Sequence, residues 1–473
     1  MAGAMHFNLF MMDTGHHEAS WRLPGSYPLA NVDIEYFERL ARLAESVTFD
    51  SVFLADSPVL HEDPERRPSG RLEPLTLLTA VARATRRIGL IATASTSYND
   101  PYNLARRFAS LDHVSGGRAG WNIVTTAGDD AAQNFGLDGQ PSHLERYQRA
   151  DEFVEVARKL WDSWEDDAIV ADPERGVWAA ADKVHAIDHR GRFFQVRGPL
   201  NLSRSPQGHP VLVQAGSSQD GRDFAARHAE AVFTAQQTLE EGQAFYADLK
   251  RRAALAGRDP DGVKILPGLV PVIGSTEAEA LELDAQLDRL ILAAQARDRL
   301  ARQFGLDPAQ LPLDEQLPDD LPTEAEIEGA KSRYTLIVEL ARRERLTVRQ
   351  LIGRLGGGRG HRTFAGTPEQ IADTIEHWGS HGAADGFNIM PAALPSGFEL
   401  FAEHVVPILR ERGLLRHEYE GTTLREHYGL PRPPSQYAVA SAARSSADTA
   451  LAGASPAGAS PAGASPAPAG ALT

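Results

Sequence analysis

The chain alternates between short apolar runs and longer stretches in which apolar residues recur at every third or fourth position. The short runs have the length of strands, and the longer stretches have the period of helices with one buried face. Eight such strand–helix pairs follow one another along the chain. The predicted strands are Met5–Met12, Ser51–Asp56, Ile88–Ser95, Ala119–Thr125, Pro210–Gly216, Ala231–Thr234, Val263–Gly274 and Asp385–Met390.

Eight strand–helix units in succession predict an α/β protein with a (β/α)8 TIM barrel. A doubly wound open sheet is the alternative, because short strands are easily miscounted. Two insertions interrupt the repeat, at about 165–209 after the fourth helix and at 305–366 around the seventh and eighth strands. The second contains the glycine-rich "GGGRGHRTFAG", which we interpret as flexible. Long insertions on a barrel commonly act as lids or as contacts between subunits.

We assign residues 1–437 to the barrel domain. From 438 to 473 the chain is rich in Ala, Ser, Gly and Pro, with "GASPA" repeated. Such a composition cannot bury enough apolar surface to order itself, so a disordered tail is predicted.

The composition limits which class of protein this is and which partners it can have. Apolar residues make up 42% and charged residues 24%, as in soluble globular proteins, and the net charge is 48 − 64 = −16. A strongly acidic chain repels nucleic acids and anionic membrane surfaces. There is no cysteine, the beginning of the chain does not look like a signal peptide, and no apolar run reaches the roughly 18 residues of a membrane span. We expect a cytoplasmic protein without nucleic-acid or membrane partners.

One strand carries an unexpected polar residue. Asn122 lies in the middle of "AGWNIVT", which otherwise has the pattern of a buried strand. A buried amide needs hydrogen-bond partners, which either a neighbouring loop or a bound molecule must supply. Trp121 alternates to the opposite face and is predicted to pack against the surrounding helices.

Other polar residues fall where barrel enzymes place their chemistry, at the carboxyl ends of the strands. Asp56 ends the second predicted strand, and Thr93 and Ser95 lie near the end of the third. Asp56 could equally cap the loop that follows it.

A candidate phosphate site follows the fifth predicted strand. Ser217 and Ser218 lie at a helix start, where free backbone N–H groups and the positive end of the helix dipole favour an anion. His143 and Tyr147 are four residues apart at the start of the fourth helix and share one face of it. The alternative is that the serines only cap an ordinary helix.

No metal site is predicted. His16 and His17 are adjacent, whereas barrel metallohydrolases need two histidines separated by one residue after the first strand.

Several stretches together resemble one family, the bacterial-luciferase-like flavin monooxygenases. Within it the chain is similar to the branch of nitrilotriacetate, EDTA and dibenzothiophene-sulfone monooxygenases. The resemblance extends from the first strand to about Pro434. The matching stretches include "TGHHEASWR", "SVFLAD", "ATASTSYNDPYNLARRFASLDHVSGGRAGWNIVTT", "RYQRADEFVEVARKLWDSWEDDA", "GPLNLSRSPQGHPVLVQAGSS", "DGFNIMP" and "YEGTTLREHYGL".

The resemblance implies a (β/α)8 barrel oxidoreductase that binds FMN without a covalent bond. FMN would arrive as FMNH2 from a separate NAD(P)H:flavin reductase and react with O2, and the resulting flavin peroxide would transfer one oxygen atom to a small organic substrate. A homodimer or homotetramer is expected.

The resemblance also implies roles for individual residues. Asp56 would lie beside the flavin ring, Thr93 and Ser95 would contact the flavin, and Asn122 would bond its polar edge. The expected contacts with the ribityl and phosphate groups are His143, Tyr147, Ser217 and Ser218.

Oxygen transfer of this kind needs a proton donor that works near neutral pH, for which histidine is suited. His17, after the first strand, and His361, in the second insertion, are the candidate catalytic residues. Either could instead be a packing residue of its loop. The second insertion would act as a lid over the flavin.

Three other functions compete with this one. A deazaflavin (F420)-dependent dehydrogenase shares the barrel, a metal-dependent barrel hydrolase would need the missing histidine pair, and a non-catalytic flavin-binding protein would need no proton donor. The sequence does not specify the substrate.

Overall fold

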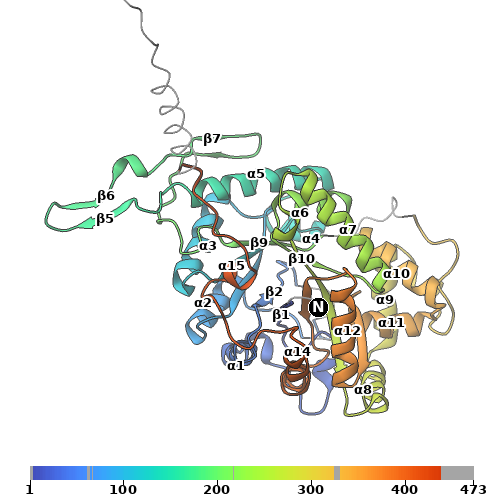
Figure 1. Ribbon diagram of the computed structural model, residues 1–473. Helices are drawn as coiled ribbons and strands as arrows, with labels where there is room; N and C mark the ends of the chain where they lie inside the picture. Colours follow the sequence, from blue (N-terminus) through green and yellow to red (C-terminus); the bar gives the residue numbers. More distant parts are fainter. Residues whose placement is uncertain are drawn as a thin grey trace, which may run out of the picture. The chain divides into compact units, whose positions relative to one another are not determined.

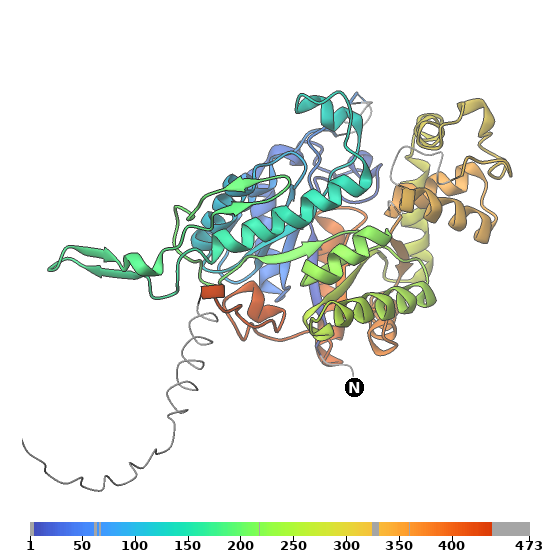
Figure 2. The same cartoon turned by 90° about the horizontal axis from the view of Figure 1, so that it is seen from above.

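The computed structural model describes residues 4–60, 64–65, 68–216, 218–323, 331–358 and 360–437 (Figures 1 and 2). The chain divides into two units, 1–433 and 434–473, and every feature described below belongs to the first. The predicted disordered tail at 438–473 lies outside the described residues.

Eight parallel strands close into a barrel, which confirms the predicted fold. Each of the eight predicted strands forms at its predicted place. The barrel strands are β1 His6–Phe10, β2 Ser51–Leu54, β3 Gly89–Ser95, β4 Ala119–Val124, β9 Val211–Gln214, β10 Ala231–Thr234, β11 Lys264–Ile273 and β13 Gly386–Ile389. They pair in the order β1-β2-β3-β4-β9-β10-β11-β13, and the pairing of β13 with β1 closes the ring.

Helices follow the strands, as the alternating pattern predicts. They are α1 Ile34–Ser46, α2 Pro74–Ala84, α3 Pro101–Ser115, α5 His143–Trp161, α6 Gln219–His228, α7 Leu239–Leu255, α12 Pro368–Ser380 and α14 Val406–Glu411. Their starts carry ordinary capping chemistry: Asp100, for example, accepts two backbone N–H bonds just before Pro101. At the end of α3, Gly116 adopts the left-handed conformation (φ 73°) that glycine takes at low cost.

Trp121 packs outward between the helices, as predicted. Its side chain is fully buried and contacts Phe108 of α3 and both Phe153 and Trp161 of α5. The indole N–H donates to the carbonyl of Ala94 over 3.0 Å, so the one polar atom of this side chain is satisfied. The tryptophan therefore contributes to packing and not to the site.

The first insertion forms two antiparallel hairpins. The first pairs β5 (Ile169–Asp172) with β6 (Val177–Ala179), and the second pairs β7 (His189–Arg190) with β8 (Gln195–Val196).

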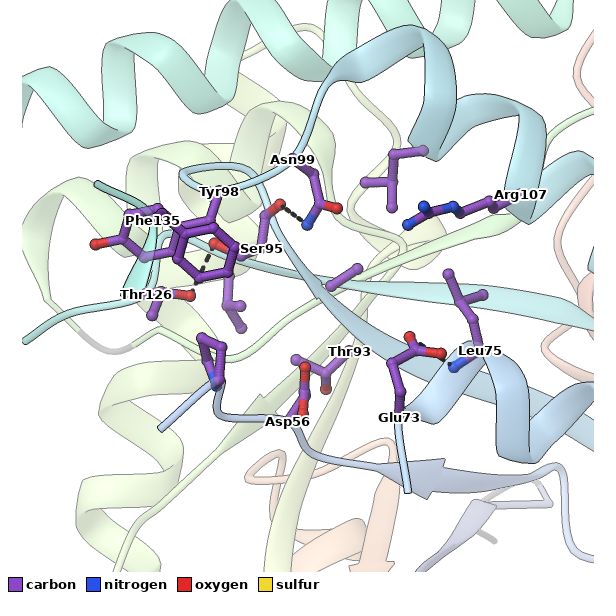
Figure 3. A pocket seen from close by; sticks show the side chains of 14 residues that line it. Asp56, Glu73, Leu75, Thr93, Ser95, Tyr98, Asn99, Arg107, Thr126 and Phe135 are labelled. Atoms are coloured by element: carbon purple, nitrogen blue, oxygen red, sulfur yellow. Dashed lines mark hydrogen bonds between the residues drawn. The ribbon is translucent and has the colours of Figure 1, made fainter. Parts of the chain in front are cut away.

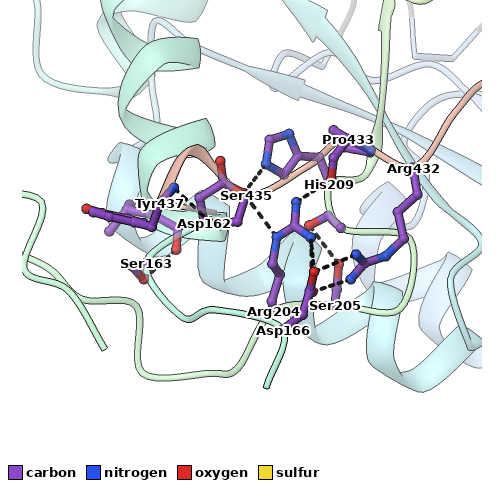
Figure 4. A network of polar contacts seen from close by, with 12 residues as sticks. Asp162, Ser163, Asp166, Arg204, Ser205, His209, Arg432, Pro433, Ser435 and Tyr437 are labelled. Carbon is purple, nitrogen blue, oxygen red and sulfur yellow. Dashed lines mark hydrogen bonds and ion pairs between the residues drawn. The ribbon is translucent and has the colours of Figure 1, made fainter. Parts of the chain in front are cut away.

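An ion network anchors the end of this insertion to the end of α5 (Figure 4). The buried guanidinium of Arg204 donates to Asp162 (3.0 Å) and Asp166 (3.0 Å), and His209 contacts Asp162 over 2.8 Å. Arg432 also contacts both oxygens of the Asp166 carboxylate, and this second pair is about half exposed. Burial lowers the pKa of His209, although Asp162 opposes that shift. Asp162 therefore has two buried partners, which fixes where the chain re-enters the barrel.

After β11, and before the second insertion, the chain forms two helices, α8 (Glu277–Arg289) and α9 (Ala293–Phe304). Further on, α10 covers Lys331–Glu344 and α11 covers Val348–Gly358. Helices α9 to α11 enclose an apolar cluster of their own.

The glycine run that we interpreted as flexible has regular secondary structure over most of its described residues. The α11 helix continues through the first glycines, and Arg362–Gly366 forms a further strand, β12, paired with the outer half of β11. A β-carbon at Gly356 would collide with Ile291, and one at Gly358 would lie 2.9 Å from Thr363. These glycines allow α11 to pack closely against its neighbours. From composition alone, the same glycines were interpreted as a flexible segment.

The segment before the end of the first unit closes the amino-terminal mouth of the barrel. Leu424 of the short helix α15 (Leu424–His427) is fully buried, and its side chain lies close to two barrel glycines. A β-carbon would lie 2.4 Å from it at Gly89 and 3.1 Å from it at Gly120. Tyr428, also fully buried, donates to Asn8 inside the barrel over 2.8 Å. Arg425 forms a two-bond pair with Glu230. We call residues 424–428 the barrel plug.

Within the described part of the chain, no helix is long and apolar enough to cross a membrane.

Candidate active site

A pocket of about 220 Å³ opens at the carboxyl ends of β2, β3 and β4 (Figure 3). Asp56, Thr93 and Ser95, three of the residues predicted to contact a flavin, line it. Thr126, beyond the end of β4, is a fourth lining residue. The structure therefore brings these side chains together at the end of the barrel where barrel enzymes bind their ligands.

Asp56 lies in the loop that follows β2. Burial raises the pKa of its carboxyl group, and the Ser57 N–H opposes that rise. An acid with a raised pKa that lines a pocket is a common feature of functional sites.

Asn122 lies opposite Thr93 in the register between β3 and β4. Its amide Nδ2 donates to the Thr93 hydroxyl over 2.8 Å, and its side chain is 2% exposed. Its carbonyl Oδ1 is buried and has no hydrogen-bond partner among the described residues. Since a buried unpaired carbonyl costs free energy, this atom points to a ligand that donates a hydrogen bond.

The outer wall of the pocket is aromatic. Tyr98 stacks on Phe135 with a centroid distance of 4.6 Å and an interplanar angle of 2°. Behind this stack, the Thr126 hydroxyl donates to Ser95 Oγ (2.8 Å), and the Ser97 N–H donates to the same oxygen (3.1 Å). The Ser95 hydroxyl therefore also holds the loop after β3.

The predicted phosphate site forms around the start of α6. Ser218 is the N-cap of this helix and accepts the Gly221 N–H over 3.1 Å. Burial raises the pKa of the Tyr147 hydroxyl, and the side chains of Ser218 and Thr125 act in the opposite direction. A β-carbon at Gly221 would lie 3.0 Å from both Ser218 Oγ and Tyr147 Oη, so glycine keeps this approach open. Ser217 lies outside the described residues.

His143 belongs to the same cluster. Its ring lies 4.9 Å from that of Tyr147, and its Nδ1 contacts Asp220 over 2.8 Å. Both partners of this ion pair are about half exposed, so solvent screens it. We call His143, Tyr147, Ser218 and Gly221 the helix-start cluster.

His17 lies away from the pocket, with both ring nitrogens engaged. The Ala19 N–H donates to Nδ1 (3.1 Å), so Nε2 carries the proton and donates to Asp288 of α8 (3.3 Å). The imidazole is fully buried. In this conformation His17 joins the loop after β1 to α8, the helix that follows β11.

His361 lies just before β12, beside the barrel strands. Its ring stacks on Phe233 of β10 with a centroid distance of 4.8 Å and an interplanar angle of 2°. On β11, Gly268 leaves room for the imidazole, since a β-carbon there would overlap its Nδ1. Neither His361 nor His17 lines the pocket at β2–β4.

Asp220, Asp288 and Phe135 belong to these contacts and were not predicted. An acidic residue in the first turn of α6 is visible in the sequence and could have been proposed as a partner of His143. Asp288 is 271 positions from His17, so no local pattern could have linked them. Among the described residues, no group of three or more acidic or histidine side chains is arranged to hold a metal ion.

A closed barrel with a pocket and a cluster of polar side chains at the carboxyl ends of its strands has the layout of a barrel enzyme. The profile of one family, described as "Luciferase-like monooxygenase", matches residues 8–385.

Curated relatives and solved structures agree with that match. N-acetyl-S-(2-succino)cysteine monooxygenase of Bacillus subtilis (strain 168) is 48% identical over 91% of this chain and 97% of its own. Nitrilotriacetate monooxygenase component A of Aminobacter aminovorans is 47% identical over 92% and 99%. The structure of EDTA monooxygenase from Chelativorans sp. BNC1 has a TM-score of 0.78, 37% identity, and coverage of 91% and 99%.

The chain belongs to the luciferase-like monooxygenase family, and it is a flavin-dependent monooxygenase. The predicted family, fold and type of enzyme are thereby confirmed, and the dehydrogenase, hydrolase and non-catalytic alternatives are set aside.

Proposed function

We propose that the chain is the oxygenase component of a two-component system. It takes FMNH2 from a separate NAD(P)H:flavin reductase and uses O2 to oxidise a small organic substrate. When bound, FMNH2 would supply two electrons and two protons, so that one oxygen atom enters the substrate and the other leaves as water. That a relative at 47% identity is named component A supports a system of two proteins. We expect it to work in the cytoplasm as a homodimer or homotetramer.

The unpaired carbonyl of Asn122 is the observation that carries the proposed flavin site. It lies beside Thr93, which lines the pocket, and a flavin ring offers N–H groups that would satisfy it. Asp56, Thr93 and Ser95 would surround the ring. Tyr147, His143, Ser217 and Ser218 would hold the phosphate end, since hydroxyl and helix-start N–H groups bind anions.

We propose His17 and His361 as the candidate proton donors, and of the two we favour His361. Its ring extends into the space that Gly268 leaves beside the barrel strands. The proton on His17 Nε2 is directed at Asp288, so His17 would have to break that bond before it could act.

Oxygen consumption tests the activity. FMNH2 would be supplied by an added flavin reductase and NADH, and small substrates, including those of the two relatives above, would be screened in an oxygen electrode. We expect one substrate to acquire a single atom of ¹⁸O from ¹⁸O2 in step with oxygen uptake. The proposal is wrong if added protein changes neither the rate of oxygen uptake nor the incorporation of ¹⁸O into any substrate.

Variants of the helix-start cluster test the phosphate end. His143→Ala and Ser218→Ala should each weaken FMN binding several-fold, since each removes a polar contact to an anion. Flavin fluorescence titration measures the effect. Thr423→Ala is the matched control: it removes the N-cap of α15 at the opposite end of the barrel and should leave FMN affinity unchanged. If His143→Ala and Ser218→Ala both bound FMN with unchanged affinity, the helix-start cluster would not be the phosphate site.

A further inference from the structure

Arg146, in the first turn of α5, is a buried cation. It is 7% exposed, and its Nη1 donates to the backbone carbonyls of Thr125 (3.1 Å) and Thr126 (2.8 Å) at the end of β4. No carboxylate of the described residues lies within ion-pair distance of it. Burial lowers the pKa of the guanidinium, but an arginine stays charged at neutral pH.

The other edge of this guanidinium has no hydrogen-bond partner among the described residues. Its Nε is buried and unpaired there, and its Nη2, which is not among the buried unpaired atoms, makes no hydrogen bond with them either. Nε and Nη2 form the fork that binds carboxylate or phosphate oxygens with two parallel bonds. A buried Nε without a partner costs free energy, and an anion at the Nε–Nη2 edge would satisfy it.

Arg146 adjoins the helix-start cluster through Thr125. The Thr125 carbonyl accepts from Arg146, and the Thr125 side chain acts on the pKa of the neighbouring Tyr147 hydroxyl. Tyr147 Oη and Ser218 Oγ in turn approach Gly221 together. Tyr98, from the aromatic wall of the pocket, is the other tyrosine that interacts electrostatically with Arg146, and its buried hydroxyl is also unpaired. Arg146 therefore lies between the pocket and the proposed phosphate end.

The charges of the cluster give the reason for such a residue. A phosphate monoester carries nearly two negative charges at neutral pH. Asp220, which adjoins the cluster and pairs with His143, would repel that anion. An arginine without a counter-carboxylate supplies the missing positive charge.

We propose that the Nε–Nη2 edge of Arg146 binds an oxyanion, and that this oxyanion is the phosphate of FMN. The inference rests on the proposed function, because it assumes FMN as the flavin. A substrate carboxylate has the same chemistry and is the alternative source.

Comparison of FMN with riboflavin, which lacks the phosphate, tests the assignment. The folded wild-type protein should bind FMN more tightly than riboflavin in fluorescence titrations. Arg146→Gln should lower FMN affinity about ten- to a hundredfold and leave riboflavin affinity unchanged. Arg146→Lys keeps the charge and loses the fork, so its FMN affinity should lie between that of the wild type and that of Arg146→Gln. This variant replaces Arg146→Gln if the latter does not fold.

Arg149→Gln is the matched control from the same helix. Arg149 also donates to loop carbonyls, those of Thr96 (3.1 Å) and Asn99 (3.3 Å), but it uses Nε and Nη2 to do so. The fork of Arg149 is therefore occupied. The protein should still prefer FMN to riboflavin in the Arg149→Gln variant.

Three results would overturn the inference. If Arg146→Gln weakened the binding of FMN and of riboflavin equally, Arg146 would support β4 and would not be a phosphate ligand. If the FMN affinity of this variant were unchanged, Arg146 would not contact the flavin at all. Thermal stabilisation of the wild type by succinate and not by inorganic phosphate would assign the fork to a carboxylate. A wild-type protein that binds neither flavin would instead refute the proposed function, which separates the two failures.

Discussion

Replacing Asn122 by Ala is expected to weaken FMN binding about tenfold or more without lowering the stability of the flavin-free protein. The reason is that Asn122 Oδ1 is buried and has no partner among the described residues, so its removal relieves a cost that offsets the loss of the Nδ2–Thr93 bond. The same removal takes a hydrogen bond from the flavin. Flavin titration and urea unfolding of the same preparations measure the two effects.

Asn8→Ala is the matched control. Asn8 is also 2% exposed inside the barrel, but both ends of its amide are paired: Nδ2 donates to Asn388, and Oδ1 accepts from Ser51 and Tyr428. Its loss leaves several buried groups unpaired, so we expect destabilisation by about 2 kcal/mol or more. The flavin affinity of the folded protein should not change. If Asn122→Ala behaved like Asn8→Ala in both measurements, Asn122 would be a structural residue.

The second large effect concerns the barrel plug. Arg425→Met should lower the free energy of unfolding by about 3–5 kcal/mol, because it leaves Glu230 without its partner. Arg425 is 3% exposed and donates to both Glu230 oxygens (2.6 and 3.0 Å) and to the His209 carbonyl. Urea unfolding followed by circular dichroism measures the change.

Arg432→Met is the control for this variant. Arg432 also makes two contacts with a carboxylate, that of Asp166, but its side chain is 43% exposed. Exposed pairs contribute about 0–1 kcal/mol, so the loss should be small. The double variant Arg425→Met/Glu230→Leu should recover part of the lost stability. Similar losses for both single variants would show that the plug is not held by its buried charges.

The barrel could be predicted because its strands follow a local pattern. Each strand is a short apolar run, and each helix has the period of one buried face, so no long-range contact was needed to locate them. β12 was missed because its residues Arg362–Gly366 are mostly half-buried and follow a glycine run. The helical glycines of α11 were missed because close packing against Ile291 and Thr363 is invisible in one sequence.

The site was predictable to a different degree at each residue. Asn122 stood out because a polar residue in an apolar strand breaks a local rule, and breaks of that kind tend to mark functional sites. Arg146 gave no such signal, since an arginine in a helix is ordinary until its burial is known. The contact between His17 and Asp288 joins residues 271 positions apart, so it depends on how α8 packs in the folded chain.

Anaerobic titration of the folded wild-type protein with FMNH2 tests the central claim most directly. We predict saturable binding with one flavin per chain, weakened in Asn122→Ala and unchanged in Asn8→Ala. A folded protein that binds FMNH2 no better than Asn122→Ala does, or that shows no saturable binding, would contradict the assignment of this barrel end as the flavin site.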